Sequence, residues 1–428
     1  MTSPRAVVLS LGGSPEPVLA SIQRQRPEVL VFFVSPESRR TLEGDVLAKL
    51  PEGYRPAWEM VETPSAELLV ESYRALVEGL PHALSRRGIS WGEVRADFTG
   101  GTKAMSAALV LALVDRGCEF TYVGGVDALA REKGGLGVVV SGREKLFLTG
   151  DPWTEVAAGR LRAAVQLFAS GRLDAAVAGL PEPPPRGRTG ALARALRPVF
   201  EGFRDWDLQR YTGAARGLRQ GIEAWELFAE GSGDPAALRY LEMLREAAAR
   251  LERVRAEWEA LKGFRPGLPV APGIDALAIP CDLCGAAARR ARVGGDPEDG
   301  VLLLYAAVEK LAKGRLAAGH GIDNSRCPAD RLGPLAPKYE GRIKGGFAEV
   351  PLEDSFVLLR ELGDSVGNRF FENHDFLKKL QHARNHSWRE HGYVQVERNT
   401  FERLFPEVLS FLGLGEEDLV AFPVPTGF

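Results

Sequence analysis

The residues of this sequence best suited to chemistry are an arginine and a histidine near the C-terminus. Four of the six histidines fall between residues 374 and 391, around the segment Arg384-Asn-His-Ser-Trp-Arg-Glu-His391. An imidazole can move protons near neutral pH, and a guanidinium can hold a phosphate whose charge increases during attack by a ribose 2′-hydroxyl. Arg384 and His391 therefore suit metal-free cleavage of RNA.

The spacing of these two residues matters as much as their types. In an α-helix, seven positions return two side chains to within about 20° of one face, roughly 10 Å apart along the axis. We therefore expect a helix from Arg384 to His391, with both side chains facing one cleft. For such a pattern alone, a solvated helix face that ends at Gly392 is the more common explanation.

A second segment with chemical potential is Asp97-Phe-Thr-Gly-Gly-Thr-Lys-Ala-Met105, which lies between an expected strand and an expected helix. Doubly wound sheets bind ligands at such positions. The glycines let a ligand approach the backbone, the helix N-terminus offers free N–H groups, and Lys103 offers a positive charge for phosphate. The combination suits a phosphodiester, and a tight turn with Thr102 as N-cap is the structural alternative. Neither a P-loop nor a dinucleotide fingerprint is present, which argues against ATP and NAD.

Alternating strand and helix patterns surround this second segment. Amphipathic segments predict helices after Pro15 and at 37–50, 65–87 and 102–116. Short apolar runs predict strands at 6–11, 29–34, 58–61, 94–98 and 119–123, followed by a hairpin over 134–149. Such alternation is typical of a parallel sheet covered by helices, so we expect an α/β Rossmann-like fold here.

Beyond Pro152 the sequence changes to Ala, Leu, Arg and Glu at helical spacing. One long exposed helix is expected at 234–262, and proline-rich stretches at 180–185 and 263–280 interrupt the helical pattern. We therefore expect three domains: an α/β domain at 1–150, an all-α connector at 151–274 and an all-α domain at 275–428.

The composition limits the class of protein. Apolar residues make up 45% and charged residues 26%, as in soluble globular proteins, and no run is long enough to span a membrane. The N-terminus lacks a secretory signal and the four cysteines are too few for a disulfide framework, so a cytoplasmic protein is expected. A net charge of −3 argues against a protein that coats nucleic acid. Cys281 and Cys284 have zinc-ligand spacing without a second pair, so no metal site is expected.

The segment from Asp97 to Met105 closely resembles the ligand loop of CARF domains, the sensor modules of type III CRISPR-associated proteins, and the resemblance covers residues 6–149. It implies binding of a cyclic oligoadenylate, with the tetra-adenylate ring as the expected form. It also implies a homodimer with the ligand across the two-fold axis. The ligand-binding residues that the resemblance implies are Ser10, Leu11, Gly12, Gly13, Ser35, Thr99, Gly100, Gly101, Thr102, Lys103 and Met105.

The C-terminal pattern Arg-Asn-x-Ser-x-x-x-His-Gly resembles the active motif of HEPN ribonucleases, and residues 282–313 resemble the first HEPN helices. Six residues separate Arg384 from His391, where many CARF-linked members have four. The resemblance implies that Arg384 stabilises the phosphate, that His391 acts in acid–base catalysis or orients the 2′-hydroxyl, and that Asn385 positions the site. It implies no metal, and a cleft shared by two protomers.

Three neighbouring residues have a less direct role under the same resemblance. His386, Trp388 and Arg389 would line the RNA path or stabilise the helix.

These observations predict a CRISPR antiviral endoribonuclease that cleaves single-stranded RNA when a cyclic oligoadenylate shifts the connector and, through it, the HEPN cleft. Two other functions stay open. In the first, the CARF domain cleaves its own ligand, with Lys103 stabilising the charged phosphate. The second is a ligand-responsive regulator without catalysis, although no basic recognition helix in a helix-turn-helix setting follows residue 150.

Overall fold

The computed structural model describes residues 4–126, 130, 139, 143–150, 152–185, 187–266, 270, 273–372 and 374–426. The chain divides into two compact units, one of residues 1–160 and 181–191, the other of residues 161–180 and 192–428. Helix α5 (Trp153–Ala169) contains residues of both units. The finer division predicted between residues 274 and 275 stays a prediction.

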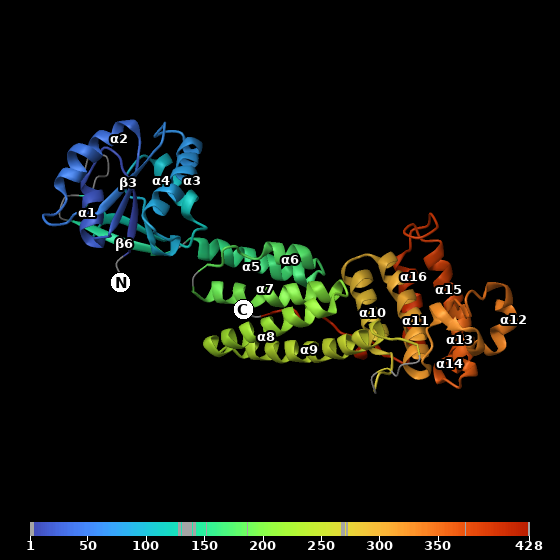
Figure 1. Cartoon of the computed structure of the whole chain (residues 1–428). Helices are drawn as coiled ribbons and strands as arrows, with labels where there is room; N and C mark the ends of the chain where they lie inside the picture. The colour runs from blue at the N-terminus through green and yellow to red at the C-terminus, as the bar shows by residue number, and fades with distance from the viewer. Residues whose placement is uncertain are drawn as a thin grey trace. The chain divides into compact units, whose positions relative to one another are not determined.

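The first unit is built on a six-stranded sheet, seen at the blue end of the chain in Figure 1. The strand order is β3-β2-β1-β4-β5-β6, and every neighbouring pair is parallel except β5 with β6. The strands are β1 (Ala6–Ser10), β2 (Val29–Val34), β3 (Ala57–Glu62), β4 (Val94–Asp97), β5 (Glu119–Gly125) and β6 (Glu144–Gly150). This arrangement confirms the predicted Rossmann-like α/β fold. Most of the turn of the predicted hairpin at 134–149 lies outside the described residues.

Helices cover both faces of this sheet. The central strands β1 and β2 are therefore buried along their whole length. Val8 and Val31 belong to the core on the side of α3 (Leu69–Arg86) and α4 (Lys103–Leu113). The alternate residues of the same strands form a second core with α1 (Glu16–Gln25) and with Leu42 and Val46, which follow α2 (Pro36–Thr41). Parallel strands covered in this way place their carboxyl ends, and the loops that follow, at one edge of the sheet.

The helix expected from residue 65 begins later, at Leu69. The Ser65 hydroxyl accepts hydrogen bonds from the backbone N–H groups of Glu67 and Leu68, both at 3.3 Å. This local turn replaces the first helical turn, as serine side chains commonly do. Residues 65–68 therefore form a loop at the carboxyl edge of the sheet.

Most elements after α5 are helices, as predicted, and a two-stranded sheet, β7 (Cys327–Pro328) with β8 (Phe347–Ala348), is the exception among the described residues. The helices are α6 (Leu173–Gly179), α7 (Gly187–Asp207), α8 (Tyr211–Ser232), α9 (Pro235–Lys262), α10 (Ala278–Ala288), α11 (Pro297–His320), α12 (Ala336–Tyr339), α13 (Leu352–Glu361), α14 (Ser365–Glu372), α15 (Asp375–Asn385) and α16 (Arg398–Leu412). No helix among the described residues is long and apolar enough to cross a membrane.

Helix α9 corrects one expectation. It begins after Asp234, whose side chain accepts from the N–H of Ala236 at 2.9 Å, as a capping residue should. It is not an exposed helix, however, because it buries a stripe that includes Tyr240, Leu244 and Leu251 and it packs along α8. Figure 1 shows the two helices lying antiparallel.

Helix α11 is central to the last part of the chain, and it packs against α10, α13, α15 and α16. A cluster of aromatic rings fills the space beside it: Phe356 stacks on Phe370 at 4.3 Å between ring centroids, and Phe376 meets Phe411 at 4.8 Å. Burial of such rings contributes strongly to core stability. The packing fixes the first turn of α15, where Phe376 lies.

Candidate functional site

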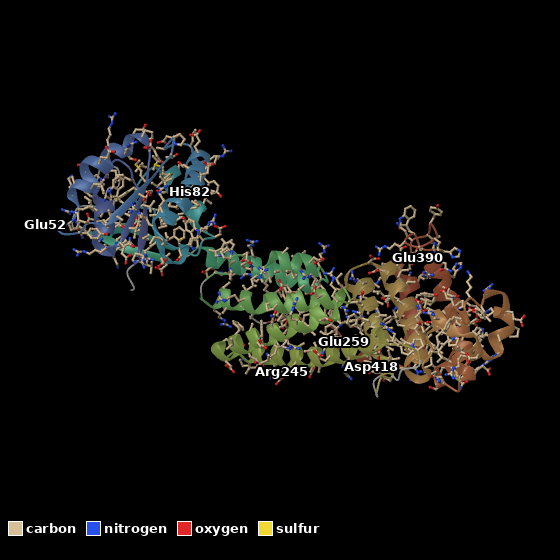
Figure 2. The ribbon with its side chains drawn as sticks, viewed as in Figure 1. Glu52, His82, Arg245, Glu259, Glu390 and Asp418 are labelled. Atoms are coloured by element: carbon tan, nitrogen blue, oxygen red, sulfur yellow. The ribbon has the colours of Figure 1, made fainter. Side chains whose placement is uncertain are left out.

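The predicted helix from Arg384 to His391 is wrong beyond its first two residues. Helix α15 ends at Asn385, and His386 is its C-cap. Residues 386–394 form a loop, which we call the histidine loop, and its Glu390 is labelled in Figure 2. Two backbone hydrogen bonds close it: Trp388 N–H donates to Val394 at 3.1 Å, and Val394 N–H donates to His386 at 3.0 Å.

Glycine is needed at position 392 of the histidine loop. A Cβ atom there would lie 2.1 Å from the carbonyl oxygen of His386, far inside ordinary contact distance. The Gly392 N–H also donates to the Ser387 carbonyl at 3.0 Å. The backbone of the loop is therefore folded tightly onto the end of α15.

The histidine loop still brings the two predicted catalytic groups together, through a third residue that the sequence interpretation missed. Glu390 Oε2 lies 3.1 Å from Arg384 Nη2 and 3.8 Å from His391 Nε2. The side chains of Arg384 and Glu390 are 29% and 25% exposed, whereas His391 is 76% exposed. The imidazole is thus largely exposed to solvent, and the guanidinium is mostly buried.

Arg384 is held from two further directions. Its Nη1 donates to Asn385 Oδ1 at 3.1 Å, and its guanidinium lies 4.8 Å from the ring centroid of Tyr305 on α11. Burial raises the pKa of the Tyr305 hydroxyl, so this ring stays neutral. The hydrogen bonds to Asn385 and Glu390 use two of the five N–H donors of the guanidinium, which leaves donors for a phosphate.

Helix α11 anchors the histidine loop through Arg389. The guanidinium of Arg389 pairs with Asp296 at 2.6 Å, and its backbone N–H donates to Glu298 at 2.9 Å. Asp296 is also the N-cap of α11 and accepts from the N–H of Asp299 at 3.1 Å. Acidic residues therefore begin α11 from a capped turn. Local sequence could not predict that the start of α11 anchors a loop about 90 residues away.

Exposed rings lie on the same loop. Trp388 is 64% and Tyr393 is 87% exposed, and their ring centroids are 5.9 Å apart in a T-shaped arrangement. The imidazoles of His382 and His386 lie 4.0 Å apart at the end of α15. Aromatic faces next to a guanidinium are a common way to hold single-stranded nucleic acid.

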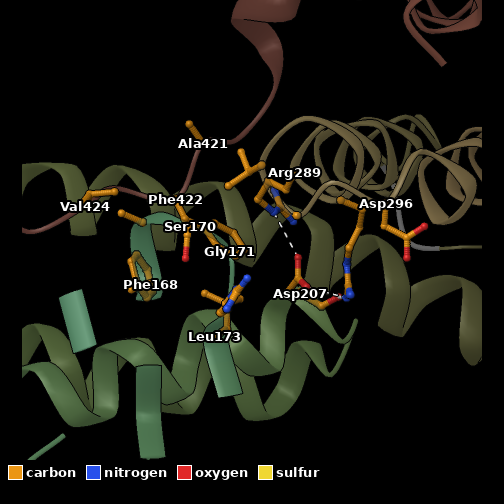
Figure 3. A pocket seen from close by; sticks show the side chains of 15 residues that line it. Phe168, Ser170, Gly171, Leu173, Asp207, Arg289, Asp296, Ala421, Phe422 and Val424 are labelled. Carbon is orange, nitrogen blue, oxygen red and sulfur yellow. Dashed lines mark hydrogen bonds and ion pairs between the residues drawn. The ribbon is translucent and has the colours of Figure 1, made fainter. Parts of the chain in front are cut away.

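A cavity of about 340 Å³ lies elsewhere in the second unit, and Figure 3 shows its lining. Asp207 at the end of α7 pairs with Arg289 at 3.2 Å and with Arg290 at 2.6 Å. The Arg289 guanidinium also covers the Phe422 ring at 3.9 Å and donates to the Val420 carbonyl at 2.9 Å. These contacts use the charges of the cavity to hold the C-terminal segment, so we assign them a structural role.

The ligand site predicted in the first unit corresponds to a cavity of about 490 Å³ at the carboxyl edge of the sheet. Its lining comes from the loops after β1, β2 and β3, from α2 and from the start of α4. Seven of the predicted residues line it: Leu11, Gly12, Gly13, Ser35, Gly101, Thr102 and Met105. The other four, Ser10, Thr99, Gly100 and Lys103, are not among its lining residues.

Ser10 and Gly100 instead form the support beneath the cavity. The Ser10 hydroxyl donates to the Gly100 carbonyl at 2.6 Å, and a Cβ at Gly100 would lie 2.2 Å from the Ser10 carbonyl oxygen. A Cβ at Gly12 would lie 3.0 Å from the backbone nitrogen of Gly101. The loops after β1 and β4 are therefore pressed together backbone against backbone, which only glycine permits.

Thr99 ties the loop after β4 to the next strand. Its hydroxyl accepts from the N–H of Val123 at 2.7 Å and donates to Asp97. Asp97 is buried, and burial raises the pKa of its carboxyl, which also accepts from Ser21 at 2.6 Å and Thr121 at 3.0 Å. Lys103, in contrast, is the exposed first residue of α4.

Two hydroxyl side chains of the cavity begin helices. Thr102 is the N-cap of α4: it accepts from the N–H of Met105 at 3.2 Å, and it donates to the Ala66 carbonyl. The tight turn with an N-capping threonine, named above as the structural alternative, is thus present at the lining of the cavity. Ser35 caps α2 in a reciprocal pair with Ser38.

Seven lining residues were not predicted, and they change the expected polarity of the site. Hydroxyls and two carboxylates predominate among the polar side chains, and the described lining residues include no Lys, Arg or His. The unpredicted residues are Glu37, Ser38, Thr41, Pro64, Ser65, Ala66 and Glu67. The Ser35 hydroxyl bonds to Glu37 and lowers the pKa of that carboxyl, which stays ionised at neutral pH.

Residues 277–414 match the family model described as the Csm6 HEPN domain. The resemblance to HEPN proteins is therefore confirmed for this part of the chain, which contains Arg384, Asn385 and His391. A comparison with curated protein sequences gives no match.

Among solved structures, the chain is similar to Enterococcus italicus Csm6 bound to cyclic hexa-2′-fluoro-hexa-dAMP, with 10% identity, a TM-score of 0.45, and coverage of 97% of this chain and 96% of that one. It is also similar to Can2 from Sulfobacillus thermosulfidooxidans in complex with cyclic tetra-adenylate, at 15% identity over 40% of this chain and 48% of that chain, with a TM-score of 0.25. A type III CRISPR defence DNA nuclease activated by cyclic oligoadenylate matches at 18% identity over 41% of this chain and 28% of that chain, with a TM-score of 0.22.

Proposed function

We propose that this protein is a type III CRISPR endoribonuclease that binds a cyclic oligoadenylate in its N-terminal CARF-like domain and cleaves single-stranded RNA in its HEPN domain without a metal. One observation carries the catalytic part of the proposal. Arg384 and His391 of a segment that matches the Csm6 HEPN domain both contact one carboxylate oxygen, although α15 ends before His391.

The chemistry follows from the exposure of the two groups. The exposed imidazole of His391 would take the proton from the ribose 2′-hydroxyl as its oxygen attacks the neighbouring phosphorus. The free N–H donors of Arg384 would stabilise the charge that develops on the phosphate oxygens. Asn385, which accepts from Arg384 at 3.1 Å, would hold the guanidinium in place. The P–O bond to the 5′-oxygen breaks and that oxygen takes up a proton from water, which leaves a 2′,3′-cyclic phosphate and a 5′-hydroxyl.

The ligand part of the proposal rests on the cavity at the carboxyl edge of the sheet. Its hydroxyls and carboxylates accept hydrogen bonds, and they lie beside the apolar side chains of Leu11 and Met105. Such a lining suits the amino group of an adenine ring or ribose hydroxyls better than it suits a phosphate. The phosphates of a cyclic oligoadenylate would then lie outside the lining, where Lys103 is exposed.

The dimer part of the proposal has its own support. Leu69, Val70, Tyr73 and Val77 are exposed on one face of α3, which borders the sheet of the first unit. A stripe of this kind on a globular unit commonly marks an interface. A homodimer would bury it, and light scattering should give twice the mass of one chain.

The test uses the full chain and a labelled single-stranded RNA, with EDTA present. We expect cleavage only after a cyclic oligoadenylate is added, and calorimetric titration with tetra- and hexa-adenylate rings should identify the activator. His391→Ala should abolish cleavage and leave the ring affinity unchanged. Cleavage that needs no ring, or that EDTA abolishes, would contradict the proposal.

A further inference from the structure

Glu390 is the residue that connects the two groups proposed for catalysis. Its Oε2 lies 3.1 Å from Arg384 Nη2 and 3.8 Å from His391 Nε2. We propose that Glu390 is a positioning residue, which holds the guanidinium and the imidazole at the separation needed to act on one ribose–phosphate linkage. This inference rests on the proposed ribonuclease function and adds a third side chain to it.

The place of Glu390 is imposed by its neighbours on both sides. Arg389, the residue before it, is fixed to α11 by Asp296 and Glu298 at 2.6 and 2.9 Å. Gly392, two residues later, is folded against the carbonyl of His386. The N–H of Glu390 itself donates to the Ser387 carbonyl at 3.2 Å. Because the loop already restricts Glu390, little further conformational entropy is lost when its carboxylate orders Arg384 and His391.

The charge of Glu390 is what the contact requires. A carboxylate accepts a charge-assisted hydrogen bond from a guanidinium, which is stronger than a bond to a neutral amide. Three-quarters of the Glu390 side chain is shielded from water, so solvent weakens the pair less than it weakens an exposed one. Tyr305 supports Arg384 from α11, and Glu390 supports it from the histidine loop. Without Glu390, only the neighbouring Asn385 would hold the guanidinium by a hydrogen bond among the described contacts.

The opposite role would be inhibition, in which Glu390 occupies the guanidinium and must leave before RNA binds. The contact geometry favours positioning. The described hydrogen bonds of Arg384 go to Asn385 and Glu390, so N–H donors remain for a phosphate while Glu390 stays in place. His391 is exposed in the same arrangement.

The two roles predict opposite results for Glu390→Gln, which preserves size and removes the charge. We expect the kcat for a short single-stranded RNA, with saturating cyclic oligoadenylate, to fall about 10- to 100-fold, as for a displaced catalytic group. The KM for RNA should change less than about threefold, because the groups that bind the rest of the strand are untouched. Glu390→Asp keeps the charge and should recover part of the kcat.

Glu407→Gln is the matched control, because Glu407 pairs with Lys379 at 3.3 Å on the surface of the same unit. It should leave kcat, KM and melting temperature unchanged. A Glu390→Gln protein that cleaves as fast as the Glu407→Gln control, or faster without the ring, overturns the positioning role. A wild-type protein that cleaves no RNA with any cyclic oligoadenylate overturns the proposed function itself. A fall in kcat for Glu390→Gln that Glu390→Asp restores, at unchanged melting temperature, supports both the positioning role and the proposed function.

Discussion

Replacing Gly392 with alanine should inactivate the HEPN site without unfolding the protein. The added Cβ would lie 2.1 Å from the His386 carbonyl oxygen and 2.3 Å from its carbonyl carbon, whereas ordinary contact begins at 3.4 Å. The histidine loop must therefore move away from the end of α15 by about 1 Å or more, and a displacement of that size can lower a catalytic rate about 100-fold. Glu390 and His391 move with the loop, and Arg384 stays on the helix.

The assay is the rate of RNA cleavage with saturating cyclic oligoadenylate, accompanied by calorimetric melting and by titration of the ring. Gly341→Ala is the control, since no atom lies within 4 Å of the Cβ that it adds in the same unit. We expect the melting temperature of Gly392→Ala to change little, because the loop is largely exposed, and the ring affinity to be unchanged. If Gly392→Ala cleaves RNA as fast as Gly341→Ala, the tight folding of the loop does not position the catalytic groups.

Three further predictions concern other parts of the chain. Thr102→Val removes the N-cap of α4 and the hydrogen bond to the Ala66 carbonyl. It should therefore lower the stability of the first unit by about 1 kcal/mol and weaken binding of the cyclic oligoadenylate, and calorimetry measures both effects. Thr102→Ser should retain both hydrogen bonds. Trp388→Ala removes an exposed ring next to the catalytic groups and should raise the KM for RNA about 5- to 100-fold with a smaller effect on kcat, if a base stacks there. Hydrogen bonds from Arg292 lower the pKa of Glu402 below its usual 4.5, so the pair stabilises the fold above that value and its contribution is lost as the pH falls through the folded pKa. The difference in melting temperature between wild type and Glu402→Gln should therefore shrink as the pH is lowered from about 6 to about 3.

The sequence predicted the first unit well because its elements are short and strongly patterned. The strands from Ala6 and Val29 were recognisable from buried apolar runs, and the glycines at 100 and 101 marked the loop that supports the cavity. The loop at 65–68 was missed, because a Ser65 hydroxyl bonded to its own backbone is indistinguishable in sequence from a helix cap. Because this loop was missed, its residues Ala66 and Glu67 were not predicted to line the cavity.

The sequence identified Arg384 and His391 as candidates for catalysis but did not predict their geometry. A helix through His391 would place Glu390 about 120° away from the face of Arg384, so the residue between the two groups could not be recognised under that assumption. The helix ends earlier because the histidine loop bonds back on itself and is anchored to Asp296 and Glu298. Contacts between residues so far apart in the chain have no local sequence signal.

The contact between the loops after β1 and β4 has a mechanical consequence for the first unit. Because Gly12 touches Gly101 and Gly100 touches Ser10 through backbone atoms, neither segment has room to slide past the other. The two loops therefore form one rigid support. A cyclic oligoadenylate that displaces either loop would displace both of them, together with the first turn of α4. A displacement of this contact would therefore move the segments that lead into α1 and α4 together.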